Sequence, residues 1–140
     1  MTSPANMALR RPNPPIGLGQ ALAETGSVSA MMDLSDGLRQ DLARLCAASR
    51  VGAVISPEKL PPHPDVSGAA DALSMMTAFG EEYELLFIAQ VGSAKLIQQA
   101  AAPFGSHPVC IGVVTDRADD GARLEGVEWP EPRFTHFGEA

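Results

Sequence analysis

The stretch from residue 28 to residue 46 constrains the fold of this chain more than any other part of the sequence. An apolar run from Val28 to Leu34 is typical of a strand, and two carboxylates three positions apart, Asp33 and Asp36, stand at its end. The next residues repeat apolar side chains at the spacing of an amphipathic helix, namely Leu38, Leu42, Leu45 and Cys46. Most charged residues of this helix are predicted to lie off that apolar stripe, namely Arg39, Asp41, Arg44 and Arg50. The stretch therefore predicts a strand, a tight turn and a helix that packs on a sheet.

The turn between that strand and that helix carries the residues best suited to bind a phosphate or a metal ion. Backbone N–H groups at the start of a helix are unpaired and carry partial positive charge, so they suit phosphate oxygens. Asp33 and Asp36 supply the hard oxygen ligands that Mg²⁺ prefers. The alternative is that Ser35 or Asp36 caps the helix, since Ser and Asp are preferred there. Taken alone, the turn favours capping, because caps occur at most helices and metal sites are rare, but capping leaves Asp33 unexplained.

Most of the remaining sequence alternates between predicted helices and predicted strands. Helices are predicted over residues 16–25, 66–78 and 93–102, and strands over residues 53–56, 109–114 and a run that ends at Ile88. Residues 119–121 are typical of a hairpin turn, after which residues 122–129 return as a strand. Strands that alternate with helices and finish in a hairpin predict an α/β (α+β) sandwich, in which helices cover a mixed β-sheet.

Length and proline content predict the domain organisation. With 140 residues and 45% hydrophobic content, the chain is large enough to bury one ordinary core. Residues 1–15 are rich in proline, which cannot donate a backbone hydrogen bond, so an extended arm or linker is predicted there. Residues 16–140 are predicted to form a single domain.

Charge and cysteine content narrow the classes of partner. A net charge of −7 argues against a nucleic acid or an anionic membrane as the main partner, since both are polyanions. No apolar run approaches membrane-spanning length. The only cysteines, Cys46 and Cys110, lie far apart without CxxC spacing, so we expect reduced thiols and a cytoplasmic protein.

A second candidate site is the acidic pair Glu81 and Glu82, which stands just before a β-branched and aromatic strand. Two adjacent carboxylates at the head of a buried strand suit ligand binding. The alternative is a solvated turn, which is at least as consistent with the sequence, because Glu is usually exposed.

Four motifs occur in an order and spacing that resembles a known family. They are Asp33-Leu34-Ser35-Asp36-Gly37-Leu38, Gly80-Glu81-Glu82-Tyr83-Glu84-Leu85-Leu86-Phe87, Cys110-Ile111-Gly112-Val113-Val114 and Phe134-Thr135-His136-Phe137. Together they resemble the C-terminal domain of thiamine-monophosphate kinase, within the AIR synthase-related, PurM-like superfamily. The resemblance covers nearly the whole chain, and four ordered motifs are far more specific than any one of them.

The resemblance implies an activity and a set of site residues. The family transfers the γ-phosphoryl group of ATP to thiamine monophosphate, with several Mg²⁺ ions, and gives thiamine diphosphate. By position, Asp33 and Asp36 match magnesium ligands, Ser35 matches a nucleotide contact, and Glu81 and Phe134 match contacts to the thiamine substrate. No catalytic residue is implied, in keeping with a reaction that depends on positioning and on cations. An aromatic face at Phe134 would also suit a cationic thiazolium ring.

The resemblance also implies a partner domain. In this family an N-terminal domain supplies most of the magnesium-binding aspartates, much of the nucleotide site and the homodimer interface, so we expect the isolated chain to be inactive. Two alternatives remain: a domain of another PurM-like, ATP-using synthetase, and a non-catalytic module that binds a ligand or a partner protein.

Overall fold

The computed structural model describes residues 16–61, 72–78 and 84–131. The helices are α2 (Leu18–Glu24), α3 (Leu38–Ser49), α4 (Ala72–Ala78) and α5 (Ala94–Ala101). The strands are β1 (Val28–Asp33), β2 (Gly52–Ile55), β3 (Leu85–Ala89), β4 (Gly112–Thr115) and β5 (Ala122–Leu124). Short 3-10 turns cover Pro57–Lys59, Ala102–Phe104 and Ala118–Asp120. The predictions for residues 1–15 and 66–71 fall outside the described residues.

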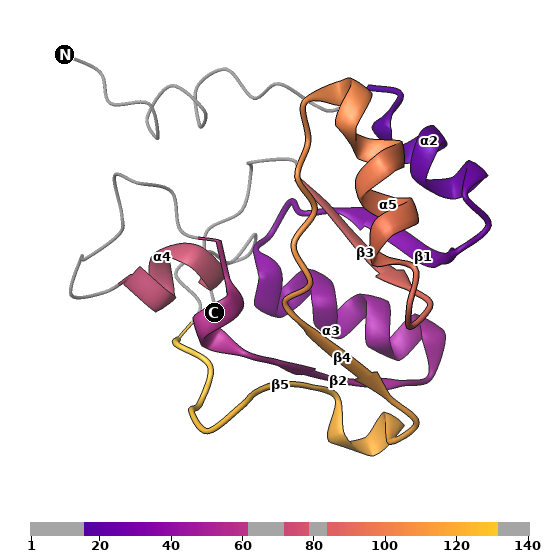
Figure 1. Ribbon diagram of the computed structural model, residues 1–140. Helices are drawn as coiled ribbons and strands as arrows, with labels where there is room; N and C mark the ends of the chain where they lie inside the picture. The colour runs from indigo at the N-terminus through magenta and orange to yellow at the C-terminus, as the bar shows by residue number, and fades with distance from the viewer. Residues whose placement is uncertain (1–15, 62–71, 79–83, 132–140) are drawn as a thin grey trace, which may run out of the picture.

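The described strands form two sheets (Figure 1). In the first sheet, β1 pairs with β3 in antiparallel fashion, with Met31 opposite Phe87 and Asp33 opposite Leu85. In the second sheet β2 lies in the middle, antiparallel to β4 and parallel to β5. The predicted α/β (α+β) class, with helices and a mixed β-sheet, is confirmed, but the described strands are divided between an antiparallel pair and a three-stranded mixed sheet.

The hairpin predicted at residues 119–121 is wrong. β5 does not pair with β4; it pairs with the opposite edge of β2. Gly121 ends the intervening 3-10 turn with a φ of 57°, a conformation that favours glycine, and its carbonyl accepts a hydrogen bond of 2.9 Å from the Ala53 N–H group. The chain is thus carried across β2 before β5 begins. The returning strand is also shorter than predicted, ending at Leu124.

Two apolar clusters cover the two faces of the β1–β3 sheet. On one face α3 packs with β2, in a cluster of buried residues made of Leu38, Leu42, Leu45, Cys46, Ala53, Ile55, Leu60, Leu86 and Leu124. On the other face α2 and α5 contribute Leu18, Leu22, Ile97 and Ala101, which contact Met31 and Phe87 of the sheet. Alternate side chains of each strand point to opposite faces, so one sheet separates two helical layers.

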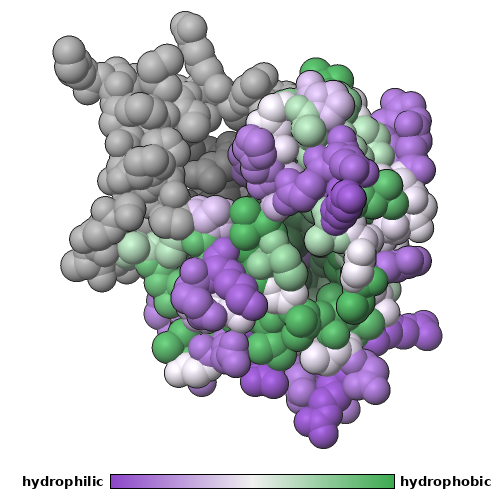
Figure 2. Space-filling model, viewed as in Figure 1, coloured by the Kyte–Doolittle hydropathy of each residue, from purple (hydrophilic) through white to green (hydrophobic). Residues whose placement is uncertain are grey.

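Part of the surface over the second sheet is apolar. Figure 2 shows hydrophobic residues gathered on the face that β4 crosses. β4 itself exposes Val113 (64%) and Val114 (42%). The two side chains point to opposite faces of the sheet, and the face that carries Val113 also carries the exposed Arg123. An exposed apolar area is available there for contact with another domain or protein.

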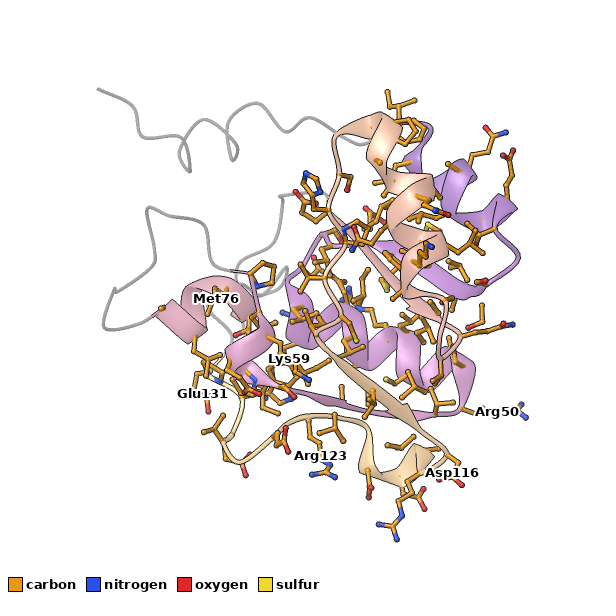
Figure 3. All side chains as sticks on the ribbon, in the orientation of Figure 1. Arg50, Lys59, Met76, Asp116, Arg123 and Glu131 are labelled. Atoms are coloured by element: carbon orange, nitrogen blue, oxygen red, sulfur yellow. The ribbon has the colours of Figure 1, made fainter. Side chains whose placement is uncertain are left out.

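Helix α3 spans the molecule and thereby sets the position of the turn before it. It begins on the side where α4 and the last described residues lie, and it ends at Arg50 on the opposite side (Figures 1 and 3). Contacts between α3 and α4 support this arrangement. The predicted strand, turn and helix of residues 28–46 are confirmed in order and type.

Candidate functional site

The turn at residues 34–37 joins the end of β1 to the start of α3. The Leu34 N–H group donates a 2.8 Å hydrogen bond to the Glu84 carbonyl, which continues the β1–β3 pairing one step past Asp33. Gly37 then takes a φ of 105° and a ψ of 156° at the N-cap position of α3. Side chains other than hydrogen rarely permit this conformation, so glycine makes the abrupt change from strand to helix possible.

The capping interpretation of Ser35 and Asp36 is wrong. The N-cap residue is Gly37, and no side chain makes a cap hydrogen bond there. Instead Asp41, one turn into the helix, accepts hydrogen bonds at its Oδ2 atom from the backbone N–H groups of Ser35 (2.8 Å) and Asp36 (2.9 Å). Two backbone donors of the turn are therefore satisfied by the protein itself rather than left for a phosphate.

The prediction that Asp41 lies off the apolar stripe of α3 is also wrong. Its side chain is 0% exposed. Asp41 follows Leu38 by three residues and precedes Leu45 by four, and residues at these spacings share a face of a helix. The sequence did contain a signal for the burial of Asp41, namely a single carboxylate on an otherwise apolar stripe.

Arg44 links the two buried carboxylates. Its guanidinium forms an ion pair with Oδ2 of Asp36, and it donates a 3.0 Å hydrogen bond to Oδ1 of Asp41. Asp36 is 5% exposed, whereas the Arg44 side chain is 54% exposed. The hydrogen bond to Asp36, together with the charges of both aspartates, raises the pKa of Arg44 above its ordinary value. Arg44 therefore neutralises negative charge at the turn from the solvent side.

The structure brings three of the five predicted site residues together on one short segment. Asp33 is exposed at the end of β1, Ser35 is half-buried, and Asp36 is buried against Arg44. Glu81 and Phe134 lie outside the described residues. Among the described residues, no group of three or more His, Cys, Asp or Glu side chains is arranged to hold a metal ion. Two carboxylates on one turn still suit Mg²⁺, which is commonly bound through one or two carboxylates with water and substrate phosphates completing its shell.

The segment that contains Trp129 and Pro130 also lies at this end of α3. The Arg39 guanidinium donates a 2.8 Å hydrogen bond to the Pro130 carbonyl, and the Trp129 indole N–H group donates one of 2.9 Å to the Ala122 carbonyl. Trp129 also packs against the apolar cluster around α3. The segment that leads to the end of the chain is thus held beside the first turn of α3. Sequence reasoning missed this contact because its two partners lie 91 residues apart.

Within the helices of residues 16–61, 72–78 and 84–131, none has the length and apolar content needed to cross a membrane.

Comparison with known proteins extends these observations. Residues 7–125 match the family described as AIR synthase related protein, C-terminal domain. The thiamine-monophosphate kinase of Halobacterium salinarum is 36% identical over 131 residues, which cover 88% of this chain and 41% of that protein. The chain belongs to the family of AIR synthase related proteins, as their C-terminal domain.

Two solved structures show the same fold. The crystal structure of thiamine-monophosphate kinase from Stenotrophomonas maltophilia superposes with a TM-score of 0.79 at 29% identity, covering 89% of this chain and 39% of that one. The structure described as AaThiL complexed with AMPPCP and TMP gives a TM-score of 0.73 at 25% identity, covering 98% of this chain and 43% of that one. The resemblance to the C-terminal domain of thiamine-monophosphate kinase, drawn from the motifs, is confirmed. The chain spans between about a third and two fifths of the length of the curated relatives it matches.

Proposed function

We propose that this chain is the C-terminal domain of an ATP-dependent, cytoplasmic kinase that phosphorylates thiamine monophosphate to thiamine diphosphate. The observation that carries the proposal is the likeness, over 98% of this chain, to a structure described as a complex with AMPPCP and TMP. The acidic turn of residues 33–37 supports it, because phosphoryl transfer depends on cations that neutralise charge on the phosphate oxygens.

The site residues divide into three roles. Asp33 and Asp36 bind Mg²⁺, Ser35 contacts the nucleotide, and Glu81 and Phe134 contact the thiamine substrate. When bound, Mg²⁺ supplies charge neutralisation and holds donor and acceptor phosphates in line. The protein's part is to present the carboxylates: Asp33 stands exposed at the strand end, while Asp36 is oriented by its ion pair with Arg44. A cation at Asp36 therefore shares that carboxylate with Arg44 or displaces the guanidinium.

The contact between Arg39 and Pro130 supports the role of Phe134. Arg39 lies two residues after Gly37, in the first turn of α3. Phe134 follows Pro130 by four residues, and four extended residues span at most about 14 Å. Phe134 is thus joined by a short stretch of chain to a residue that is held beside the first turn of α3.

The relatives' greater length supports a division of the active site between two domains. This chain covers 35–41% of the first curated relatives. We propose that an N-terminal domain supplies the other magnesium ligands, much of the nucleotide site and a homodimer interface. The apolar face crossed by β4 is then surface available for contact with such a domain (Figure 2). The chain alone is expected to show negligible turnover, because phosphoryl transfer relies on positioning by a complete ligand set.

The test is a two-domain protein in which this chain follows the N-terminal domain of a relative. ADP formation is measured with ATP, Mg²⁺ and thiamine monophosphate, and turnover in the ordinary range for kinases of about 1–100 s⁻¹ is expected. Asp33→Asn should abolish it, while the matched control Asp116→Asn, an exposed aspartate at the opposite side of the molecule (Figure 3), should leave it unchanged. A folded two-domain protein that turns over other phosphate acceptors but not thiamine monophosphate would refute the proposal.

A further inference from the structure

Asp41 is an unusual residue for its position. Its neighbours on the buried face of α3, Leu38, Leu42 and Leu45, are all apolar, yet Asp41 carries a charge and is 0% exposed. A buried carboxylate is costly unless it is hydrogen-bonded or paired. Here it is fully engaged: two backbone N–H groups donate to Oδ2, and Arg44 donates to Oδ1. An apolar residue would fill the same space but would leave the two N–H groups without this acceptor.

The two donors belong to consecutive residues of the turn. Successive backbone N–H groups that converge on one point form a concavity that suits an anion. In this protein the Asp41 carboxylate already occupies that concavity, at 2.8 Å from the Ser35 nitrogen and 2.9 Å from the Asp36 nitrogen. The backbone of the turn is therefore held in one geometry without any ligand.

Arg44 couples Asp41 to the side chain of Asp36. One guanidinium nitrogen contacts both carboxylates, so part of its positive charge is directed to Asp41 rather than to Asp36. If Asp41 were neutral, Arg44 would pair with Asp36 alone and would compete more strongly with a cation for that carboxylate.

From these contacts we infer that Asp41 is a positioning residue that makes the turn at residues 33–37 a cation site rather than an anion site. The inference rests on the proposed function, in which Asp33 and Asp36 bind a divalent cation. Asp41 acts through its neighbours: it occupies the backbone donors that a phosphate would use, and it draws the charge of Arg44 away from Asp36.

The experiment uses Mn²⁺ and inorganic phosphate as separate probes on the 140-residue chain, followed by amide NMR. Mn²⁺ should broaden the resonances of residues 33–36, while phosphate should leave the Ser35 and Asp36 amides unshifted. Asp41→Leu should weaken Mn²⁺ binding by about 10–100-fold, the usual loss when a residue that orients metal ligands is removed. Asp41→Asn keeps an oxygen for the two N–H groups but loses the charge that engages Arg44, and should weaken binding about tenfold.

Leu42→Ala is the matched control, since it removes a buried apolar side chain from the next position of α3 but no hydrogen-bond acceptor of the turn. It should lower stability but leave the Mn²⁺ affinity of the folded protein unchanged. Equal Mn²⁺ affinity in Asp41→Asn and wild type, or equal losses in Asp41→Asn and Leu42→Ala, would overturn the inference, even if Asp41→Leu does not fold. A selective phosphate shift at Ser35 and Asp36 in the wild type would overturn it as well. Absence of broadening at residues 33–36 in the wild type would instead overturn the metal assignment in the proposed function, and the inference with it.

Discussion

The turn at residues 33–37 and the turn at residues 116–121 are both acidic, and each ends in an Asp-Gly step whose glycine has a positive φ. In the first turn, Asp36 is buried and held by Arg44. In the second, Asp120 contacts Arg117 only at 3.9 Å, and the Arg117 side chain is 77% exposed. The difference arises from the element that begins after each glycine. A twelve-residue helix with a buried carboxylate comes after Gly37, whereas a three-residue strand comes after Gly121.

The comparison shows that an acidic turn alone carries little information about function. Exposed pairs such as Arg117 and Asp120 contribute little to stability, because solvent and salt screen them. At the start of α3, by contrast, the buried Asp41 carboxylate holds the backbone of the turn, and the Arg44 guanidinium holds the Asp36 carboxylate. Such fixed geometry is what a metal or a phosphate-bearing substrate requires.

The largest difference in stability between variants of the two turns is expected when one carboxylate is removed from each turn. Asp41→Ala leaves two buried backbone N–H groups and Arg44 without their acceptor, and should lower the free energy of unfolding by about 3 kcal/mol. Asp119→Ala, in the exposed turn, should change it by less than about 0.5 kcal/mol. Urea unfolding of both variants measures the difference. Similar losses in the two variants would contradict the distinction between the turns.

Prediction from sequence succeeded where the pattern is local. β1 and α3 are predicted from an apolar run and from apolar residues at helical spacing, and both were found at the expected places. The position of β5 could not be predicted in this way, because the choice between pairing with β4 and pairing with β2 depends on contacts distant in sequence. The Asp-Asp-Gly sequence at residues 119–121 indicates only that the chain changes direction there. The connection that crosses β2 between β4 and β5 needs such a change as well.

The candidate site was predicted in part for the same reason. Asp33, Ser35 and Asp36 are close together in sequence, so their grouping on one turn was visible in the sequence. The contact between Arg39 and Pro130 was not visible, since it joins distant segments. Asp41 was visible by its spacing, but a charged residue is more often exposed than buried, and only packing of α3 on the sheet reveals the exception.

Replacement of Gly37 and replacement of Gly121 are expected to lower stability by similar amounts. The difference between the two turns would then come from their side chains and not from their backbone. Gly37 has a φ of 105° and Gly121 a φ of 57° with a ψ of −151°, and both conformations are strained for any other residue. Gly37→Ala and Gly121→Ala should each lower the free energy of unfolding by about 1–3 kcal/mol. Thermal or urea unfolding measures the two losses. A loss confined to Gly37→Ala would show that the backbone itself distinguishes the turns.

Replacement of Arg44 and replacement of Arg117 should also differ in their effect on the free energy of unfolding. This difference should be smaller than the one between Asp41→Ala and Asp119→Ala. Arg44→Met removes the charge that bridges Asp36 and Asp41, and should cause a measurable loss of stability well below that of Asp41→Ala, because solvent screens a half-exposed guanidinium. Arg117→Met, which removes only a loose pair to Asp120, should be close to neutral. Unfolding at low and high salt separates the two, since salt screens the exposed pair more than the part-buried one. A wild-type advantage over Arg44→Met that vanishes in about 1 M salt would contradict a part-buried pair.

The smallest effect on stability, and the most direct test of the metal assignment, is expected at Asp33. Asp33 and Asp116 are both exposed aspartates at a strand end, in the first and the second turn respectively. Without metal, Asp33→Asn and Asp116→Asn should each change the free energy of unfolding by less than about 0.5 kcal/mol, because neither carboxylate is buried. With Mn²⁺ at about ten times its dissociation constant, a ligand bound only to the folded state should stabilise wild type and Asp116→Asn by about 1.4 kcal/mol. The same Mn²⁺ concentration should stabilise Asp33→Asn by clearly less, since one of the two ligands is lost. Equal stabilisation of all three proteins would show that the cation binds elsewhere, and cation binding would then not distinguish the two acidic turns.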